Sequence, residues 1–327
     1  MILLSMKQKP PFHITPLILR KSQEIARQLG LLSGAKIDLT PVQLRRINNI
    51  KTIQASLAIE GNTLDIGHIT QIFEGKRVVG PEKDIIEVKN AIKVYRGLSH
   101  LNPLSIDDLL KAHKILMKDL IPENGKWRTG GVGIFKGAEV RHVAPPAKRL
   151  SALMENLFEF LKDHNELPWL LKACIFHYEL EFIHPFSDGN GRMGRLWQQL
   201  ILMKEDPVFQ YIPIEVLIKE NQGEYYRVLG ECDRLGESTL FIEFCLEQIF
   251  NALKNYTKTT LTAVVDSETR IDYAKPKLSG KWFSRKEYLE LHKNISSATA
   301  SRDLLYGVKK GILGKRGEKN QVKYVFV

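Results

Sequence analysis

Residues 184–195 read HPFSDGNGRMGR and combine a histidine, an acid, a Gly-Asn-Gly turn and two arginines at fixed spacing. Gly189 and Gly191 bracket Asn190, so the backbone N–H groups of this turn can point into one concavity. The apolar residues that follow predict an amphipathic helix starting here. Because the N-terminus of a helix attracts anions through its unpaired N–H groups and its dipole, the stretch predicts a phosphate-binding turn.

The side chains of this stretch also suit phosphate chemistry. Arg192 and Arg195 are three residues apart and share one helix face, where guanidinium groups can bind phosphate oxygens bidentately. Asp188, at the edge of the turn, is the kind of carboxylate that holds Mg²⁺ beside phosphates. His184 can accept a proton near neutral pH. His-Pro or Gly-Asn-Gly alone is more often a plain turn or loop, but the complete set favours catalysis on a phosphate.

The stretch matches every position of the signature H-x-F-x-[D/E]-G-N-G-R-x-x-R, and residues 10–255 resemble the Fic family of nucleotidyl transferases. The resemblance implies a mainly α protein: a Fic-type helical bundle with a small β-hairpin flap. It implies that the chain transfers the AMP of ATP to a Ser, Thr or Tyr hydroxyl of a protein, including itself, with Mg²⁺ as the metal.

The resemblance also assigns roles to individual residues. His184 is the expected general base, Phe186 is expected to pack into the core, and Asp188 is the expected Mg²⁺ ligand. Attack at the α-phosphorus would then expel pyrophosphate. The expected phosphate ligands are an anion hole of Gly189, Asn190 and Gly191, with Arg192 and Arg195 on the β- and γ-phosphates.

Residues 130–146, GGVGIFKGAEVRHVAPP, interrupt the helical pattern. Two short apolar pieces flank KGAE and predict a β-hairpin. In the resemblance this hairpin is the flap, along which a target protein binds by β-strand addition. The resemblance places Ile134 over the adenine and Tyr225, Tyr226 and Leu229 at the nucleoside pocket. Packing in the protein core is the alternative for these four side chains.

A second motif, SLAIEGN, occupies residues 56–62. Ser56 and Glu60 are four residues apart on one helix face, and Gly61 suits the left-handed cap that ends a helix. The motif resembles the inhibitory pattern of the family, [S/T]-x-x-x-E-[G/N]. The resemblance implies that Glu60 pairs with Arg195, so that ATP binds in an unproductive pose. The alternative is a helix that merely ends in Glu-Gly.

Apolar residues recur at three- and four-residue spacing through most of the chain and predict helices. The predicted helices cover residues 16–29, 41–60, 82–98, 106–120, 148–161, 169–181, 192–204 and 240–255. We expect four regions: an N-terminal helical region (1–100) with the inhibitory helix at about 41–61, a Fic catalytic core (101–258), a polar linker (259–280) and a C-terminal domain (281–327).

The C-terminal domain is basic, since residues 275–327 contain 13 Lys and Arg against 4 Asp and Glu. Helices at 284–291 and 296–310, followed by strands at 312–316 and 322–327, predict a winged-helix domain. In the second helix we expect Ala300, Leu304 and Leu305 to pack inward. The basic charge suggests an anionic partner such as DNA; a protein partner and a solvated basic surface are equally open, and so is a homodimer.

The composition is that of a soluble globular protein, with 43% apolar and 26% charged residues in 327. No apolar run is long enough for a membrane span, and the N-terminus does not read as a signal peptide. Cys174, Cys232 and Cys245 match no metal motif. We therefore expect free thiols and a cytoplasmic location, with no membrane contact.

Two other functions fit the same residues. In one, the enzyme removes AMP from a modified protein, or does both reactions, with Glu60 acting as the base for a water. In the other, the chain is a DNA-binding regulator whose Fic domain senses nucleotide. The intact His184 argues against a pure sensor, because binding alone needs no base.

Overall fold

The computed structural model describes residues 9–34, 42–131, 133–136, 139–163, 167–262, 267–292, 295–318 and 321–327. Their contacts divide the chain into two compact units. Arg45–Thr257 and the residues up to 34 form the first unit, and Lys258–Val327 make up most of the second. Across these residues, we find no helix with the length and apolar character that a bilayer crossing requires.

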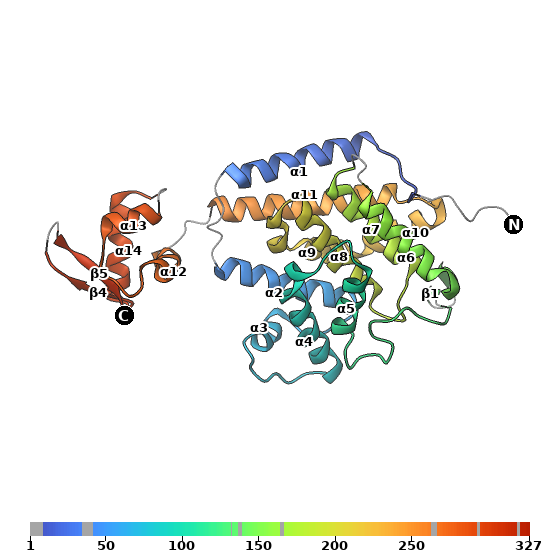
Figure 1. Cartoon of the computed structure of the whole chain (residues 1–327), viewed down its shortest axis with the longest axis horizontal. Helices are drawn as coiled ribbons and strands as arrows, with labels where there is room; N and C mark the ends of the chain where they lie inside the picture. Colours follow the sequence, from blue (N-terminus) through green and yellow to red (C-terminus); the bar gives the residue numbers. More distant parts are fainter. Residues whose placement is uncertain are drawn as a thin grey trace. The chain divides into compact units, whose positions relative to one another are not determined.

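The first unit is mainly helical, as expected (Figure 1). Its helices are α1 (Pro16–Gly34), α2 (Val42–Ile59), α3 (Ile66–Phe73), α4 (Glu82–Arg96), α5 (Ile106–Leu116), α6 (Leu150–Lys162), α7 (Trp169–Ile183), α8 (Asn190–Glu205), α9 (Ile214–Glu220), α10 (Gln222–Leu235) and α11 (Thr239–Thr262). Each helix predicted in this unit is present. The sequence patterns did not predict α3, α9 and α10, which are short or bury only a narrow stripe of side chains.

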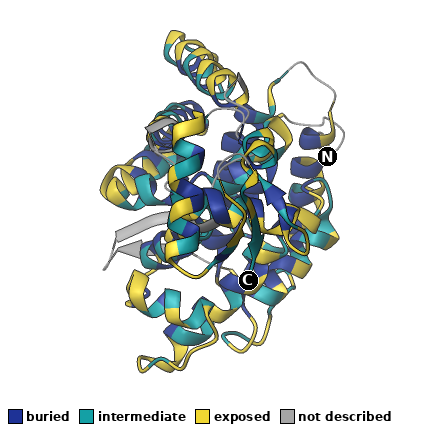
Figure 2. Ribbon diagram, turned by 90° about the vertical axis from the view of Figure 1, so that its left-hand side faces the viewer, coloured by how far each residue is buried: buried dark blue, intermediate teal, exposed yellow. Residues whose placement is uncertain are grey.

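Helices α7 and α8 form the centre of the first unit, and most side chains of both are buried; Figure 2 colours the whole ribbon by burial. Phe158 of α6 lies edge-on to Phe176 of α7 and Trp197 of α8, at ring distances of 5.4 and 6.4 Å. Gly194 allows the two helices to approach closely, since a Cβ there would lie 2.6 Å from the His177 ring. The loop that joins α7 to α8 is therefore anchored at both ends by packed helices.

Helices α1 and α11 lie side by side although they are distant in sequence (Figure 1). Lys21 Nζ is 2.7 Å from a Glu247 oxygen, and the Thr15 hydroxyl donates to Glu243 at 2.6 Å. These contacts tie the first helix to the last helix of the first unit.

The predicted hairpin is also present. Strands β1 (Gly133–Lys136) and β2 (Glu139–Val143) pair antiparallel, with Gly133 opposite Val143 and Lys136 opposite Glu139. The register shifts between Ile134 and Phe135, as at a β-bulge.

The second unit combines helices with one small sheet. Its elements are α12 (Ser267–Leu278), β3 (Phe283–Ser284), α13 (Arg285–Leu291), α14 (Ser297–Lys309), β4 (Leu313–Arg316) and β5 (Lys323–Phe326). The sheet has the order β3-β5-β4 and is antiparallel. Ser284 and Glu287 form a capping box that starts α13. Arg270 and Asp303 form a buried ion pair that joins α12 to α14.

Two sequence expectations for this unit are wrong. Residues 259–280 are not a plain linker, because α11 continues to Thr262 and α12 follows. The helix was not predicted because most residues of α12 are polar and Pro276 lies within it, so its buried side chains form no clear apolar pattern in the sequence. Leu305 does not pack inward but is 52% exposed, because Ala300, Asp303, Leu304 and Gly307 form the buried face of α14.

The core of the first unit contains a histidine that is held neutral. His177 is fully buried, its Nδ1 lies 2.6 Å from Gln198 Oε1, and burial lowers its pKa to about 3. In the unfolded chain the same side chain has a pKa of about 6.5. As pH falls below about 6.5 the unfolded chain binds a proton that the folded chain does not, which destabilises the fold.

We predict that this contribution can be isolated with His177→Gln. The stability of the parent relative to the variant should fall by up to about 1.4 kcal/mol per pH unit between about pH 6 and 4. Urea unfolding of both proteins at several pH values measures this difference. Comparing the two proteins is necessary because Glu179 and Glu215, whose pKa values burial raises to about 7, act in the opposite direction in both. A difference that is constant with pH would contradict the prediction.

Candidate active site

The loop between α7 and α8 contains the motif found in the sequence. His184 ends α7 in the left-handed conformation, with φ 48° and ψ 59°. Gly189 is the N-cap of α8 and is also left-handed, with φ 87°. A Cβ on Gly189 would lie 2.8 Å from Met117 Sδ, so this position requires glycine both for its backbone and for space. The left-handed conformations of His184 and Gly189 let the chain reverse its direction in the short loop between α7 and α8.

Asn190 closes this loop with its side chain. Its Nδ2 donates to Phe186 O and its Oδ1 accepts from Phe186 N, both at 2.9 Å. The side chain is buried and fully used in this bridge. A contribution of Asn190 to the expected anion hole would therefore come from its backbone N–H at the start of α8, not from its amide group.

His113 of α5 supports the loop from below and was not identified from the sequence. Its ring stacks on Phe186 at 3.7 Å with an interplanar angle of 9°. Nδ1 accepts from Gly125 N at 2.8 Å, so Nε2 carries the proton and donates to Asp188 O at 2.9 Å. Burial lowers the pKa of His113 to about 4, which keeps it neutral in this role. Phe186 is completely buried, as expected.

Arg192 is buried between two carboxylates. It donates to Glu87 Oε1 of α4 and to Asp188 Oδ1, each at 3.0 Å. Glu87 was not identified from the sequence and also accepts from Asn62 at 2.8 Å. Asp188 remains half-exposed, and its Oδ1 also accepts from the backbone N–H of Gly189.

Arg195 is buried and engaged by the end of α2. Its Nη2 donates to Glu60 Oε1 at 2.6 Å and to Ser56 O at 3.1 Å, and its Nε donates to the Ser56 hydroxyl at 3.2 Å. Burial lowers the pKa of Arg195, but the charge and hydrogen bond of Glu60 together with the electrostatic effects of Tyr225 and Glu181 outweigh burial, so the pKa is raised overall. The structure thus brings together the two residues that the sequence paired.

The Glu60 carboxylate sits directly over the glycine turn. Helix α2 ends at Ile59, and Gly61 turns the chain with φ 90°. A Cβ on Gly191 would lie only 2.4 Å from Glu60 Oε1. Glu60 therefore occupies space beside the backbone of the same turn that the sequence assigns to phosphate.

The residues expected at the nucleoside pocket differ in how deeply they are buried. Tyr225 is buried among core rings, 6.0 Å from those of Phe241 and Phe244, which favours the core-packing alternative for this residue. Tyr226 is half-exposed and its hydroxyl donates to the carbonyl of Ile59 at 3.4 Å. Leu229 is partly buried, and the side chain of Ile134 lies outside the described part of the structure.

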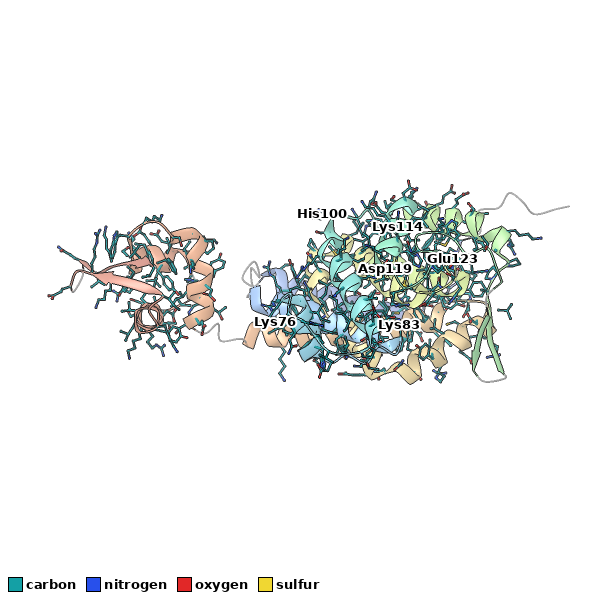
Figure 3. The ribbon with its side chains drawn as sticks, turned by 90° about the horizontal axis from the view of Figure 1, so that it is seen from below. Lys76, Lys83, His100, Lys114, Asp119 and Glu123 are labelled. Carbon is teal, nitrogen blue, oxygen red and sulfur yellow. The ribbon has the colours of Figure 1, made fainter. Side chains whose placement is uncertain are left out.

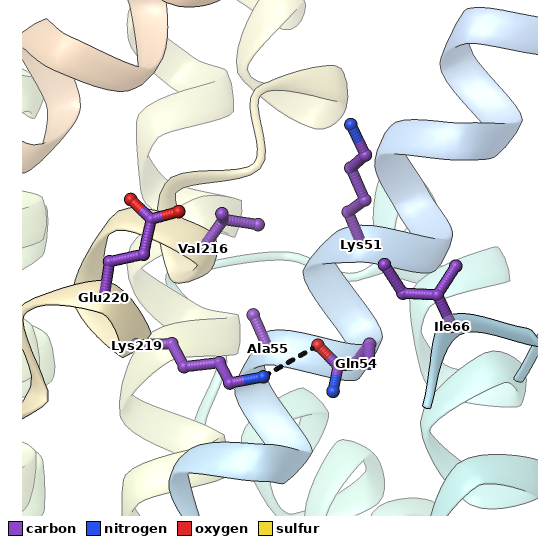
Figure 4. Close-up of a pocket in the computed structure, with 7 residues that line it drawn as sticks. All are labelled: Lys51, Gln54, Ala55, Ile66, Val216, Lys219 and Glu220. Atoms are coloured by element: carbon purple, nitrogen blue, oxygen red, sulfur yellow. Dashed lines mark hydrogen bonds between the residues drawn. The ribbon is translucent and has the colours of Figure 1, made fainter. Parts of the chain in front are cut away.

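A separate pocket of about 290 Å³ lies between α2, α3 and α9 (Figure 4). It is lined by Lys51, Gln54, Ala55, Ile66, Val216, Lys219 and Glu220. Lys219 donates to Gln54 across it at 3.1 Å. It contains no residue of the motif at 184–195, so it is not the site described above.

Several other charged side chains of the first unit are solvated. Those labelled in Figure 3 are all exposed and of both signs: Lys76, Lys83, His100, Lys114, Asp119 and Glu123. In the part of the chain that the structure describes, no three His, Cys, Asp or Glu side chains gather as a metal site. The three cysteines are buried free thiols, as expected.

Comparison with known proteins supports the reading of the motif. A family model described as the Fic/DOC family matches residues 103–202. "Protein adenylyltransferase fic-1" of Caenorhabditis briggsae is 32% identical over 228 residues, 65% of this chain and 43% of that protein. "Protein adenylyltransferase Fic" of Nematostella vectensis is 30% identical over 232 residues, 67% of this chain and 51% of that protein. The chain thus spans about half the length, or less, of these relatives.

Solved structures extend the similarity to the rest of the chain. Fic-1 from Caenorhabditis elegans has a TM-score of 0.62 at 24% identity, covering 75% of this chain and 74% of that chain, which shows the fold alone. The crystal structure of a Fic family protein from Desulfovibrio desulfuricans G20 has a TM-score of 0.74 and 38% identity, and the match covers 98% of both chains. With the motif at 184–195 intact and a match of this identity over nearly the whole length, the chain belongs to the Fic family.

Proposed function

We propose that this chain is a protein adenylyltransferase that transfers AMP from ATP to a Ser, Thr or Tyr hydroxyl of a protein, including itself, and that Glu60 holds it inactive. The names of the related proteins support the activity. The observation that carries the proposal is the arrangement of the loop: His184 ends α7, and the glycine turn at the start of α8 is followed by two buried arginines.

The proposed reaction needs one base and a grip on the leaving group. The target oxygen attacks the α-phosphorus and forms the new O–P bond, while the bond to the bridging oxygen breaks and pyrophosphate leaves. His184 takes the proton of the hydroxyl. Backbone N–H groups at the start of α8 and the guanidinium groups of Arg192 and Arg195 would hold the phosphates, so catalysis is mainly positioning and charge stabilisation.

Asp188 fits the proposed role of Mg²⁺ ligand. Its side chain is half-exposed at the turn, and the hydrogen bonds that it makes to described residues all use Oδ1, which leaves Oδ2 for a cation. A single carboxylate is a usual protein contribution to an Mg²⁺ site, where phosphates and waters complete the shell. When bound, the ion would neutralise phosphate charge.

Autoinhibition is proposed from the contacts of Arg195. A guanidinium that donates to Glu60 and Ser56 cannot present the same Nη2 to the γ-phosphate. The Glu60 carboxylate beside Gly191 also adds a negative charge where phosphate would approach. An alternative use of this carboxylate, as the base for a water in AMP removal, would need the same position.

The second unit supports a second, independent proposal: a winged-helix domain that binds DNA. Two helices followed by two strands are the expected order, and β3 completes the sheet. Basic side chains are exposed along α13, α14 and the strands, at Arg285, Lys286, Arg302, Lys309, Lys310, Lys315, Arg316 and Lys323. No acidic side chain among the described residues forms an ion pair with them, which leaves their charge for phosphates.

Glu60→Gly should release Arg195 and strongly increase transfer of AMP. We expect the variant to label itself from ATP radioactive at the α-phosphate at least about tenfold faster than the parent, since a charge-assisted hydrogen bond to phosphate is worth about 1.5–3 kcal/mol. Glu60→Gln, which keeps the shape but removes the charge, should be released in part. Autoradiography at equal protein concentration measures all three.

Arg195→Ala serves as the control for this experiment. This change removes the proposed phosphate ligand together with the Glu60–Arg195 ion pair, so the variant should not be activated. Glu60→Gly combined with Arg195→Ala should be as inactive as Arg195→Ala alone. Unchanged labelling by a folded Glu60→Gly variant that binds ATP would remove Glu60 from the inhibitory role. Slower release of AMP from a modified protein would instead favour the AMP-removing function.

His184→Ala, made in the Glu60→Gly background, should abolish transfer but leave ATP binding nearly unchanged. The phosphate ligands lie on α8 and not on His184, and a general base contributes about 10²–10⁴-fold to a rate. Single-turnover labelling and isothermal titration with ATP test the two halves of this expectation. More than about a tenth of the activity remaining would be inconsistent with His184 as the base.

Removal of the second unit should separate the two proposals. A chain ending at Thr262 keeps α11 complete, and with Glu60→Gly it should still label itself. The full chain should shift a duplex DNA probe with an affinity that falls steeply with salt, and the shortened chain should not. Equal DNA binding by the two chains, or none by the full chain, would rule out a DNA-binding role for the second unit.

A further inference from the structure

Arg128 lies between α5 and β1 and is buried, with 3% of its surface exposed. The partners of its guanidinium among the described residues are backbone carbonyls. Nε donates to His184 O and Nη1 to Gly130 O, both at 2.7 Å, and Nη2 donates to Pro145 O at 2.5 Å and Ile183 O at 3.4 Å. Burial lowers the pKa of Arg128, but an arginine side chain stays protonated, so a full charge is held here by carbonyl dipoles.

These carbonyls belong to two parts of the chain, the β1–β2 hairpin and the end of α7 with the loop that follows it. Gly130 precedes β1 and Pro145 follows β2, so both ends of the hairpin contact the same planar group. Ile183 and His184 end α7, and the backbone N–H of Arg128 also donates to Pro185 O at 2.9 Å. One side chain thus fixes the base of the hairpin to the loop that contains His184.

The contact also explains how His184 keeps an unfavourable backbone. A left-handed conformation costs a residue other than glycine about 1–2 kcal/mol, and surrounding contacts must offset it. The guanidinium donates to the carbonyls of Ile183 and His184 at the end of α7. Its positive charge also complements the negative end of the helix dipole.

We propose that Arg128 is a positioning residue that holds the His184 ring and the hairpin in one fixed arrangement. The inference rests on the proposed function, in which His184 is the base and the hairpin aligns the target. Arg128 has no contact with Arg192 or Arg195, so it acts on the alignment of the hydroxyl and the base, and not on the grip on ATP. A misplacement of about 1 Å at a reacting group costs about 100-fold in rate.

The test uses the full chain with Glu60→Gly and adds Arg128→Ala or Arg128→Lys. We expect kcat for AMP transfer to fall about 100-fold in the Ala variant and less in the Lys variant, with the KM for ATP within about twofold of the Glu60→Gly parent. Millimolar guanidinium should restore part of the rate of Arg128→Ala, because it can refill the space between the same carbonyls.

Lys172→Met is the matched control. Lys172 is a buried cation of α7, and its Nζ donates to the carbonyls of Leu161 at 3.3 Å and Asp163 at 2.7 Å, away from the loop. It should lower the melting temperature without changing kcat at a temperature where the fold is intact.

Three results would overturn the inference while leaving the proposed function in place. They are an unchanged kcat in folded Arg128→Lys and Arg128→Ala, a loss of kcat matched by Lys172→Met at equal loss of stability, or a KM for ATP that rises as kcat falls. If the Glu60→Gly parent itself transfers no AMP, the proposed function fails and this inference fails with it.

Discussion

The ion pair between Arg195 and Glu60 is the interaction on which this account depends. It joins residues 135 positions apart in the chain and connects the end of α2 to the second turn of α8. Arg195 is almost completely buried, and a buried charge without a partner would be strongly destabilising. Without nucleotide, therefore, the Glu60 carboxylate stabilises the buried charge, and with nucleotide the phosphate would supply the negative charge instead. In the proposed function, inhibition and stability thus depend on the same contact.

The same principle applies to the second arginine of the motif. Arg192 is held by Glu87 and Asp188, so both arginines are paired with carboxylates in this structure. The turn that precedes both arginines is already shaped by Gly189, Asn190 and the support of His113. The backbone part of the site is thus preorganised, whereas in the proposed function the two arginines exchange their carboxylate partners for phosphates. Exchange at Arg195 requires movement of Glu60, whose side chain is partly exposed and can leave without opening the core.

The sequence predicted the parts of the site that are encoded locally. The glycine turn, the two arginines and the spacing of Ser56 and Glu60 depend on neighbours within one or two helical turns, so residue type and spacing were sufficient. The helices around α7 and α8 were predictable for the same reason, because their apolar stripes are wide. The pairing of Glu60 with Arg195 joins distant positions, and there the resemblance to the family supplied what spacing could not.

The residues that sequence reasoning missed act over long separations. His113 contacts Asp188 across 75 positions, Arg128 contacts His184 across 56, and Glu87 contacts Arg192 across 105. Nothing in the local pattern of these residues distinguishes them from an ordinary helix or loop side chain. For Tyr225 the sequence left a nucleoside contact and core packing open, and its buried ring, which lies 6.0 Å from that of Phe241, favours core packing.

The most direct test of the central claim is to measure how much more tightly the protein binds ATP than ADP. Calorimetry in a His184→Ala background, which cannot turn over, gives both affinities. If Glu60 withholds Arg195, the chain with Glu60 should bind ATP no more tightly than ADP. The chain that also carries Glu60→Gly should bind ATP at least about tenfold more tightly than ADP, a gain of about 1.4 kcal/mol. An equal preference for ATP in the two proteins would show that Arg195 is available to the γ-phosphate despite Glu60, and would contradict the account.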